Sequence, residues 1–546
     1  AGETPSPEMV AAAPRKGTLR PRTALTLLAV GVAAFFTVLA HEDRWTLIGN
    51  LDLEKPPVVL EERAEEILAS LGYETKLRYR ASGFQFDWPL VLRLFSEHPS
   101  DTFAQLDPEG PAVAFFFLRE EADPFLPGRG TRIESDLPPP NPVNARRVRL
   151  DPSGRLVALR IAAEPQSSKP GEVDWSSVFA LAGLDLGAFE PRVPQVPVPV
   201  QNDLVAAWSG TYRGSPVTIY AAALGGRPVL FEILEPWDRG DLSEPFRGFV
   251  TLDLWIVFFL LLAAGGILAA RNVRLGRGDR RGAGRLALFF FGASLIASLT
   301  PPPGGDPLVF FQNLFKRIEG AASTVAVVWV LYLALEPFLR RYRPHAVVSW
   351  NRLLAGRWKD PMVGRDLLWG FVSAGVFLVL WGFLRGALHT IPPLAWRLDG
   401  AAACFRSWIS WSLFIAVVIA SALLLLDLLV LRLVRRQVLS TVIVAACFLA
   451  LSQPGSPKAT IMVSLYGLGL AVVARKLGFL ALVSWLAVQE MLMLWPHTLD
   501  VSSWYFENTV LALVLAGFIG VGGCLRAMGS QRLLPAGWWP EAPRRS

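Results

Sequence analysis

Long apolar runs divide the chain, and their spacing changes sharply after the first one. Residues 24–40, ALTLLAVGVAAFFTVLA, are about long enough to cross a bilayer, and no comparable run follows before about residue 250. From there, apolar runs follow one another at residues 251–270, 286–300, 321–339, 367–384, 408–433, 438–451, 461–474, 477–494 and 510–525. The pattern predicts a membrane protein, an α-helical bundle of about ten transmembrane helices. One α+β domain lies between the first and second helix.

The long segment between the first two apolar runs, residues 41–249, alternates short helical and strand patterns. Apolar positions recur at helical spacing from Leu60 to Leu71, and Gly72 is placed to end that helix. AVAFFFLRE, at residues 112–120, is typical of a buried strand because it is a short continuous apolar run. This half of the segment therefore predicts a helix followed by a strand.

Two hairpins are predicted in the same segment. Residues 146–162, RRVRLDPSGRLVALRIA, place the turn residues DPSG between two alternating runs. Residues 215–234, SPVTIYAAALGGRPVLFEIL, place a Gly-Gly pair at the tip of a second hairpin. A second helix is expected over residues 175–184. Because the order of helix and strand occurs in both halves, we expect the domain to consist of two repeated modules.

Basic residues gather in short segments beside the apolar runs. Lys and Arg number 53 against 46 Asp and Glu, which gives a net charge of +7. Arg15, Lys16, Arg20 and Arg22 precede the first run, and the positive-inside rule places that side of the membrane in the cytoplasm. Residues 41–249 are then exported. A cleaved signal peptide is the alternative interpretation of the first run.

The chain is thereby divided into five parts. We expect a disordered cytoplasmic linker at 1–23, a first transmembrane helix at 24–40 and the exported domain at 41–249. A polytopic helical membrane domain with cytoplasmic basic loops follows at 251–525, and a cytoplasmic tail at 526–546. The composition agrees, with 52% hydrophobic and 18% charged residues. The basic excess lies beside apolar runs, so it indicates topology and not nucleic-acid binding.

The sequence holds no catalytic or cofactor-binding motif. It has no GxxxxGK[ST] phosphate loop, no HExxH, no CxxC pair and no GxSxG elbow. Cys404, Cys447 and Cys524 lie in or beside apolar runs, where they have neither metal-ligand spacing nor the pattern of a disulfide framework. We therefore expect no catalytic, cofactor-binding or metal-ligating residue in this chain.

Two carboxylates lie inside predicted spans and are candidate functional residues, because charged side chains are costly there. Asp427 occurs in LLLLDLLVLRL and Glu490 in LAVQEMLMLW. A transporter or proton relay would use such groups. The structural alternative pairs Asp427 with Arg432 along its own helix, and lets Glu490, with Gln489, make an interhelical contact.

A basic and aromatic stretch at residues 336–370 separates two predicted spans on the cytoplasmic side. Its arginines alternate with apolar residues, as in a short helix that lies in an anionic membrane interface with its cations extended toward water. A docking surface for a cytoplasmic partner domain is the other interpretation. The candidate residues are Arg340, Arg341, Trp350, Arg352, Arg357, Trp358 and Arg365.

Several segments of the chain resemble parts of a known protein family. They are the stretch just described, the LDPSGRLVALRIAAEP hairpin, the segments AWSGTYRG and GRPVLFEILEPW, and above all the opening GETPSPEMVAAA. They resemble the region that follows the catalytic domain in a group of large bacterial serine/threonine protein kinases with many membrane spans. The resemblance covers nearly the whole chain, and it implies that GETPSPEMVAAA is the linker that leaves a kinase domain. ATP and Mg are expected for that kinase domain alone, because this chain has no Gly-rich loop, HRD or DFG motif.

The resemblance implies a sensor or regulatory region in the bacterial plasma (inner) membrane, with both termini cytoplasmic. Expected partners are the lipid bilayer, the attached kinase domain, an unknown exported ligand and a second copy of the chain, with no nucleic acid. The alternatives are a transporter or channel with an exported accessory domain, and a structural envelope protein.

Overall fold

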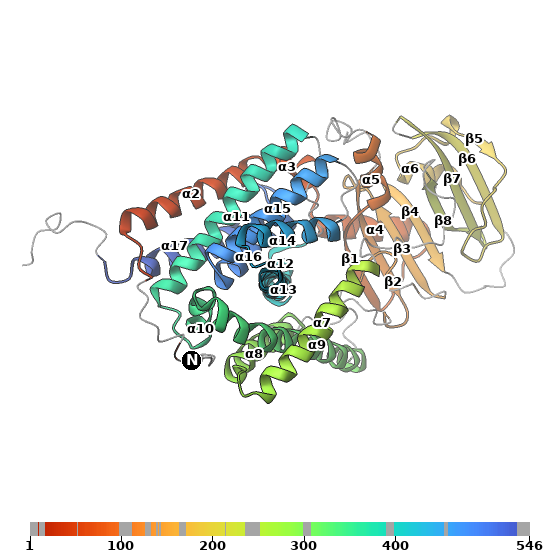
Figure 1. The fold of residues 1–546 in the computed structure, drawn as a ribbon. Coiled ribbons are helices and arrows are strands. Elements are labelled where there is room, and N and C mark those ends of the chain that lie inside the picture. Colours follow the sequence, from red (N-terminus) through yellow and green to blue (C-terminus); the bar gives the residue numbers. More distant parts are fainter. Residues whose placement is uncertain are drawn as a thin grey trace, which may run out of the picture.

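The computed structural model describes a helical bundle and, at one end of it, a domain built on a β-sheet (Figure 1). The described residues are 9, 17–51, 53–97, 112–125, 133–137, 140, 143–162, 171–212, 214–234, 252–298, 307–388, 398–452 and 457–531. Most of the predicted linker before residue 17, the end of the predicted exported domain after residue 234 and the tail after residue 531 lie outside them.

The bundle is made of long, mostly apolar helices. As far as the structure describes them, the apolar runs seen in the sequence fall on helices, and the run at 408–433 is divided between a π-helical turn (Trp408–Ser412) and α13. The helices are α2 (Pro21–Ala40), α7 (Leu252–Arg274), α8 (Arg280–Ser298), α9 (Pro307–Tyr342), α11 (Pro361–Leu388), α12 (Ala401–Ser407), α13 (Leu413–Val434), α14 (Gln437–Ser452), α15 (Pro457–Lys476), α16 (Phe479–Leu494) and α17 (Phe506–Met528).

Membrane-spanning character is clear for six stretches of helix in the part of the chain that the structure describes. Each is long and apolar enough to cross a bilayer, and they lie in α2, α9, α11, α12 to α13, α15 and α17. The apolar helices Gln437–Ala450 and Phe479–Leu494 are shorter. The protein is thus membrane-embedded, but length and composition support six spans where the sequence pattern predicted about ten.

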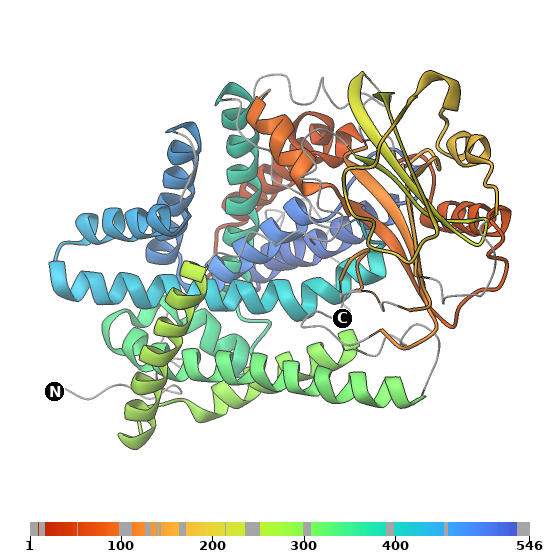
Figure 2. The same cartoon turned by 90° about the vertical axis from the view of Figure 1, so that its right-hand side faces the viewer.

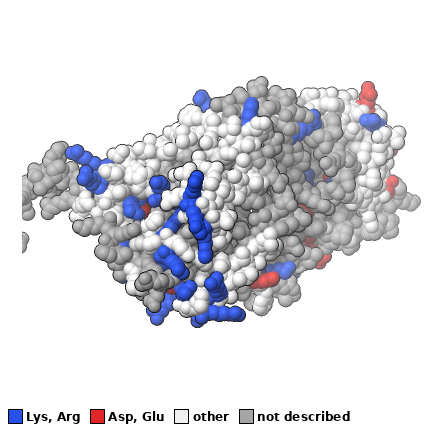
Figure 3. All heavy atoms as spheres, viewed as in Figure 1, with Lys and Arg blue, Asp and Glu red and all other residues white. Residues whose placement is uncertain are grey.

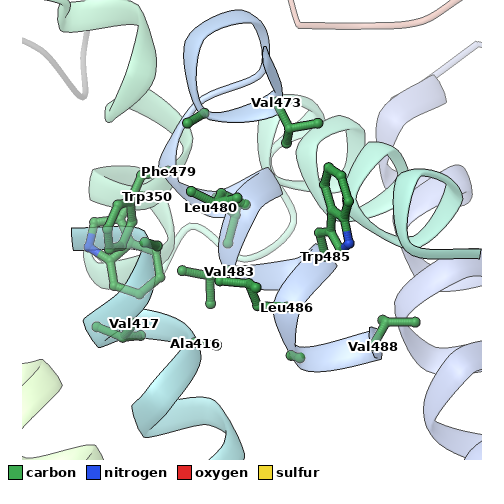
Figure 4. Close-up of a cluster of buried hydrophobic side chains, with 14 of the residues drawn as sticks. Trp350, Ala416, Val417, Val473, Phe479, Leu480, Val483, Trp485, Leu486 and Val488 are labelled. Carbon is green, nitrogen blue, oxygen red and sulfur yellow. The ribbon is translucent and has the colours of Figure 1, made fainter. Parts of the chain in front are cut away.

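The short helix α16 owes its apolar sequence to burial inside the protein. From Phe479 to Leu492 almost every side chain is buried, including Leu482 and Val488, which are completely so. Figure 4 shows side chains of α16 among those of neighbouring helices, with Trp350 and Val417 close by. A helix that is hydrophobic all round is expected where protein surrounds it on every side.

The helix ends alternate between two sides of the bundle, and one side is strongly basic. There the amide of Leu19, before α2, bonds the carbonyl of Ala527 at the end of α17. Lys and Arg gather over this end, near α10 (Val348–Leu354), on the left of Figure 3. We call it the basic end. Its exposed cations in the described chain include Arg20, Arg22, Arg341, Arg357, Lys359, Arg435, Arg436 and Lys476.

The sheet domain (residues 47–234) holds one antiparallel sheet of eight strands in the order β1-β2-β3-β4-β8-β7-β6-β5. Its helices are α4 (Pro57–Ser70), α5 (Trp88–Glu97) and α6 (Trp175–Leu181). Figure 2 views the sheet from its own end of the molecule. The strands are β1 (Tyr79–Phe86), β2 (Ala114–Glu121), β3 (Ala145–Leu150), β4 (Leu156–Ala162), β5 (Glu190–Arg192), β6 (Leu204–Tyr212), β7 (Ser215–Leu224) and β8 (Arg227–Leu234).

Local turn chemistry explains both predicted hairpins. Between β3 and β4, the Asp151 carboxylate accepts hydrogen bonds from the Ser153 hydroxyl (2.7 Å) and the Arg155 amide (2.8 Å), which closes the turn. Between β7 and β8, Gly225 and Gly226 have φ of 59° and 76°. Only a pair of residues that tolerates positive φ makes so tight a turn, so the Gly-Gly signal was correct.

The sheet is symmetric about the pairing of β4 with β8. Each half is a helix, α4 or α6, followed by strands that run in sequence toward this central pair. Leu60 and Ile67 of α4 and Phe179 of α6 are fully buried in one common core. The arrangement is the one that two repeated modules would produce, and the duplication itself stays a prediction.

Candidate functional site

Asp427 lies in a buried ionic cluster that joins several helices at the basic end. Its side chain, on α13, is 3% exposed and pairs with the guanidinium of Arg343, just after α9. The second carboxylate oxygen accepts hydrogen bonds from Arg475 of α15 (2.5 Å) and from Ser440 Oγ of α14 (2.7 Å). The expected pairing with Arg432 is wrong, because Arg432 is exposed and the partners of Asp427 come from other helices.

In this cluster one carboxylate is shared by two guanidinium groups. Removing charges from water is costly, and the cost is recovered only where partners surround the ion with good geometry. Asp427 has such partners on both oxygens. In this arrangement its carboxylate holds α9, α13, α14 and α15 together.

A second buried polar cluster lies beside the first, between α9 and the α7–α8 connection. Glu336 and Arg340 of α9 are paired at 2.5 Å and are 1% and 2% exposed. Arg340 Nη2 also donates to the carbonyl of Arg277 (2.5 Å), and the hydroxyl of Tyr332 donates to Asp279 (3.2 Å). These contacts fix the end of α9 to the connection between α7 and α8.

Glu490 lies on α16, where the neighbouring residue makes the interhelical contact. Gln489 accepts a hydrogen bond from Trp485 Nε1 (2.9 Å) and donates to the hydroxyl of Tyr466 on α15 (3.0 Å). The prediction of a polar contact between helices is thus met by Gln489. Glu490 and Asp427 lie on different helices, and no described contact joins them.

The seven candidate residues of the 336–370 stretch fall into a buried and an exposed group. Trp350 is 5% exposed and packs edge-on against Phe479 of α16 at 4.6 Å between ring centroids. Arg352 is also buried and donates to both oxygens of Asp360 (2.9 and 3.0 Å), and Arg340 is buried as described above. These three are therefore parts of the fold, and their predicted place in a lipid interface or docking surface is wrong.

The other four candidates remain at the surface. Arg341, Arg357 and Trp358 are exposed, and Arg365 is partly exposed and pairs with the buried carboxylate of Asp366 (2.8 Å). The indole of Trp358 is also covered by the guanidinium of Arg526 from the end of α17, 5.0 Å from the ring centroid. This contact is the cation–π arrangement in which a planar guanidinium lies over an aromatic face.

The junction between the sheet domain and the bundle is formed by the loop between α16 and α17. Trp504 of this loop stacks on Phe84 of β1, with centroids 5.6 Å apart and planes 12° from parallel. Its indole Nε1 donates to the carbonyl of Leu53 (2.9 Å). Tyr505 and Leu398 are buried in the same apolar core as the sheet's own residues. The core of the sheet domain thus continues into the bundle.

Further contacts at the junction tie down the end of α2. The amide of His497 donates to Glu42 (3.0 Å), just after α2, and Arg385 of α11 donates to the carbonyl of Arg44 (3.0 Å). Trp45 packs edge-on against Phe383 at 5.1 Å. Helices α2 and α17 therefore both begin or end at the junction, and both reach the basic end, where Leu19 and Ala527 are hydrogen-bonded.

Sequence reasoning missed the partners that define these sites. Arg343 and Arg475 are separated from Asp427 by 84 and 48 positions, so no helical spacing connects them. Trp504 and its partner Phe84 are likewise far apart in the sequence, and no local pattern connects them. Among the described residues, no group of three or more His, Cys, Asp or Glu is arranged to hold a metal ion. No family model, curated protein or solved structure matches the chain.

Proposed function

We propose that this chain is the membrane sensor or regulatory region of a receptor-like bacterial serine/threonine protein kinase, whose kinase domain precedes it. The sheet domain would detect an exported ligand or an envelope signal. The helices would pass that signal to the kinase, which alone would use ATP and Mg. The sequence resemblance motivates the proposal.

One observation carries the proposal furthest, the continuous core at the junction. Trp504 and Tyr505 pack into the sheet domain at one end of α17, and the other end of α17 bonds Leu19 at the start of α2. A shift of the sheet domain would therefore act on the segment through which an N-terminal kinase would be attached. Signalling of this kind needs two arrangements that the stimulus stabilises unequally.

The topology follows from the alternation of helix ends. The basic end would face the cytoplasm and the sheet domain the outside, as the positive-inside rule requires. Counting α7, α8, α14 and α16 as crossings with the six longer stretches gives the expected ten, and an even number leaves both termini cytoplasmic. The location is the bacterial plasma membrane, and a homodimer would bring two kinase domains together.

The test begins with the gene. The reading frame upstream of the codon for Ala1 should encode a Gly-rich loop, HRD and DFG. Autophosphorylation of the full parent protein in membrane vesicles is then compared between wild type, Trp504→Ala and the control Trp411→Ala, an exposed tryptophan of the bundle. A changed rate for Trp504→Ala alone supports the proposal, whereas an upstream frame without kinase motifs refutes it.

The transporter alternative predicts a direct role in transport for Asp427, which the sensor proposal does not. If that carboxylate lined a solute or proton path, Asp427→Asn would abolish flux in vesicles at unchanged folding. Its two arginine partners and its burial favour a structural role instead, so we expect no flux to be lost.

A further inference from the structure

The sheet domain carries a row of arginines across three neighbouring strands. Arg119 of β2 is opposite Arg147 of β3, which is opposite Arg160 of β4. Arg149 lies two residues further along β3 and therefore on the same face. We call these four side chains the arginine row. The next row of residues along these strands faces the opposite side of the sheet. It is entirely apolar and buried, and it consists of Leu118, Val148, Leu159 and Phe231.

Such an arrangement is costly for the fold. Like charges directly opposite each other on adjacent strands destabilise a sheet. Arg119 and Arg147 are 1% and 6% exposed, so water screens their repulsion poorly. Burial, together with the neighbouring guanidinium groups of Arg149 and Arg160, lowers the pKa of Arg147 well below its usual value. The row is therefore a place where an additional negative group would be strongly favoured.

Two of the row's counter-ions belong to the sheet itself. Arg119 Nε donates to Glu121 (2.8 Å), two residues along the same strand. Arg160 Nε donates to Glu232 of β8 (3.0 Å). These carboxylates are fixed by their strands and cannot leave while the sheet persists.

The third counter-ion comes from a short loop. Asp136 pairs with both Arg147 and Arg149, and its side chain is 28% exposed. The same arginines hold the loop, residues 133–137, together with a hydrogen bond from the Ser135 amide to the side chain of Gln85 (3.1 Å). Arg119 donates to the carbonyl of Glu134 (3.2 Å), and Arg149 Nε donates to the hydroxyl of Ser135 (2.9 Å). The bound carboxylate of Asp136 thus shows what chemistry the row accepts.

We propose that the arginine row is the ligand site of the sheet domain, and that it binds a carboxylate group of a ligand in the place that Asp136 occupies here. Arg147 and Arg149 present adjacent guanidinium groups, whose planar donors match the two oxygens of a carboxylate. Binding would release Asp136 and with it residues 133–137. The binding site itself does not depend on the proposed function, and only the signalling effect of binding rests on it.

The experiment uses the whole chain in lipid nanodiscs, with acetate, succinate and inorganic phosphate as probes at constant ionic strength. Binding is measured by calorimetry. Asp136→Asn keeps the shape of the side chain but removes the competing charge, so we expect succinate to bind about tenfold more tightly. Arg149→Gln should abolish that gain. Asp174→Ala, at the N-cap of α6, is the matched control in the same domain and should leave binding unchanged.

The outcomes separate the site from the signalling role. Succinate binding that tightens in Asp136→Asn supports the site, even if kinase activity in the parent protein fails to respond, which would count against the proposed function alone. Phosphate binding without succinate binding overturns the ligand class. No binding of any probe to wild type or Asp136→Asn, with both proteins folded by circular dichroism, overturns the site.

Discussion

The indole of Trp504 lies almost parallel to the ring of Phe84, although 420 positions of sequence separate the two residues. Trp504 belongs to a loop of the bundle and Phe84 to the first strand of the sheet. The stacked pair closes the apolar core of the sheet domain on the side that faces the bundle. The two parts of the molecule are therefore expected to resist separation as one unit.

Trp504→Ala should loosen this junction. The change removes the stacking on Phe84 and the hydrogen bond to the Leu53 carbonyl. We expect a loss of at most about 3 kcal/mol in the free energy of unfolding, since the side chain is only partly buried. Limited proteolysis of detergent-solubilised protein should show faster cleavage between the sheet domain and the bundle. Trp411→Ala, at an exposed position, should cleave like wild type, and equal rates for both variants would contradict the prediction.

Asp427→Asn should destabilise the bundle strongly. The substitution leaves the buried Arg343 and the partly buried Arg475 without their carboxylate, and breaking a buried ion pair by removing one partner costs about 3–5 kcal/mol. Thermal unfolding in detergent, followed by tryptophan fluorescence, measures the effect. Arg432→Gln serves as the control, because Arg432 is exposed and should unfold like wild type. A wild-type melting temperature for Asp427→Asn would show that the cluster does not hold the helices.

His497 should make the junction sensitive to acid. Its ring Nε2 bonds the carbonyl of Met491 (3.0 Å), while the buried Nδ1 has no hydrogen-bond partner among the described residues. Burial lowers the pKa of His497 from 6.5 to about 4. The unfolded chain therefore binds a proton at a higher pH than the folded chain does. The contribution of neutral His497 to the free energy of unfolding is fully present above pH 6.5. It is lost as the pH drops toward 4, by at most about 3 kcal/mol.

The check is the pH dependence of unfolding in wild type and His497→Asn. The difference between the two curves should shrink as the pH falls from 6.5 to 4, because the variant has no imidazole to protonate. His345→Asn, which replaces an exposed histidine at the basic end, should follow wild type. Parallel curves for wild type and His497→Asn would rule out this source of acid sensitivity.

Asp151→Ala should weaken the turn between β3 and β4. The buried carboxylate accepts hydrogen bonds from Ser153 and from the amide and Nε of Arg155, and their loss leaves donors unpaired. We expect a loss of about 2 kcal/mol in the free energy of unfolding, measured by chemical denaturation. Ser153→Ala removes one of these bonds and should cost about 1 kcal/mol. A larger loss for Ser153→Ala than for Asp151→Ala would contradict this account.

Local chemistry made part of the fold predictable. The Gly225–Gly226 pair and the Asp151 turn specify their hairpins within a few residues, and spacing alone indicates the buried face of the helix around Leu60. The apolar runs likewise identify the helices, because a helix that is apolar over such a length must be surrounded by lipid or by protein. Apolarity does not separate a helix that faces lipid from one that is surrounded by protein, so the sequence of α16 does not reveal its burial.

The sites could not be predicted in the same way, because distant residues build them. RRVRL predicts an alternating strand, but the arginine row exists only once the register sets Arg147 between Arg119 and Arg160. Trp350 and Arg352 look like interfacial residues in sequence, and their burial depends on contacts with Phe479 and Asp360. Composition and spacing carry no information about such partners.

The far edge of the sheet has a consequence for how molecules behave when crowded together. Strand β5, at the opposite edge from the strand that meets the bundle, is three residues long and wholly exposed, with Pro191 at its centre. Proline offers no amide hydrogen, so a neighbouring chain finds no row of donors and acceptors to extend. Strand β5 thus ends the sheet in a form that a second copy cannot readily extend. This edge of the domain is thereby protected from joining copies into fibres, strand by strand.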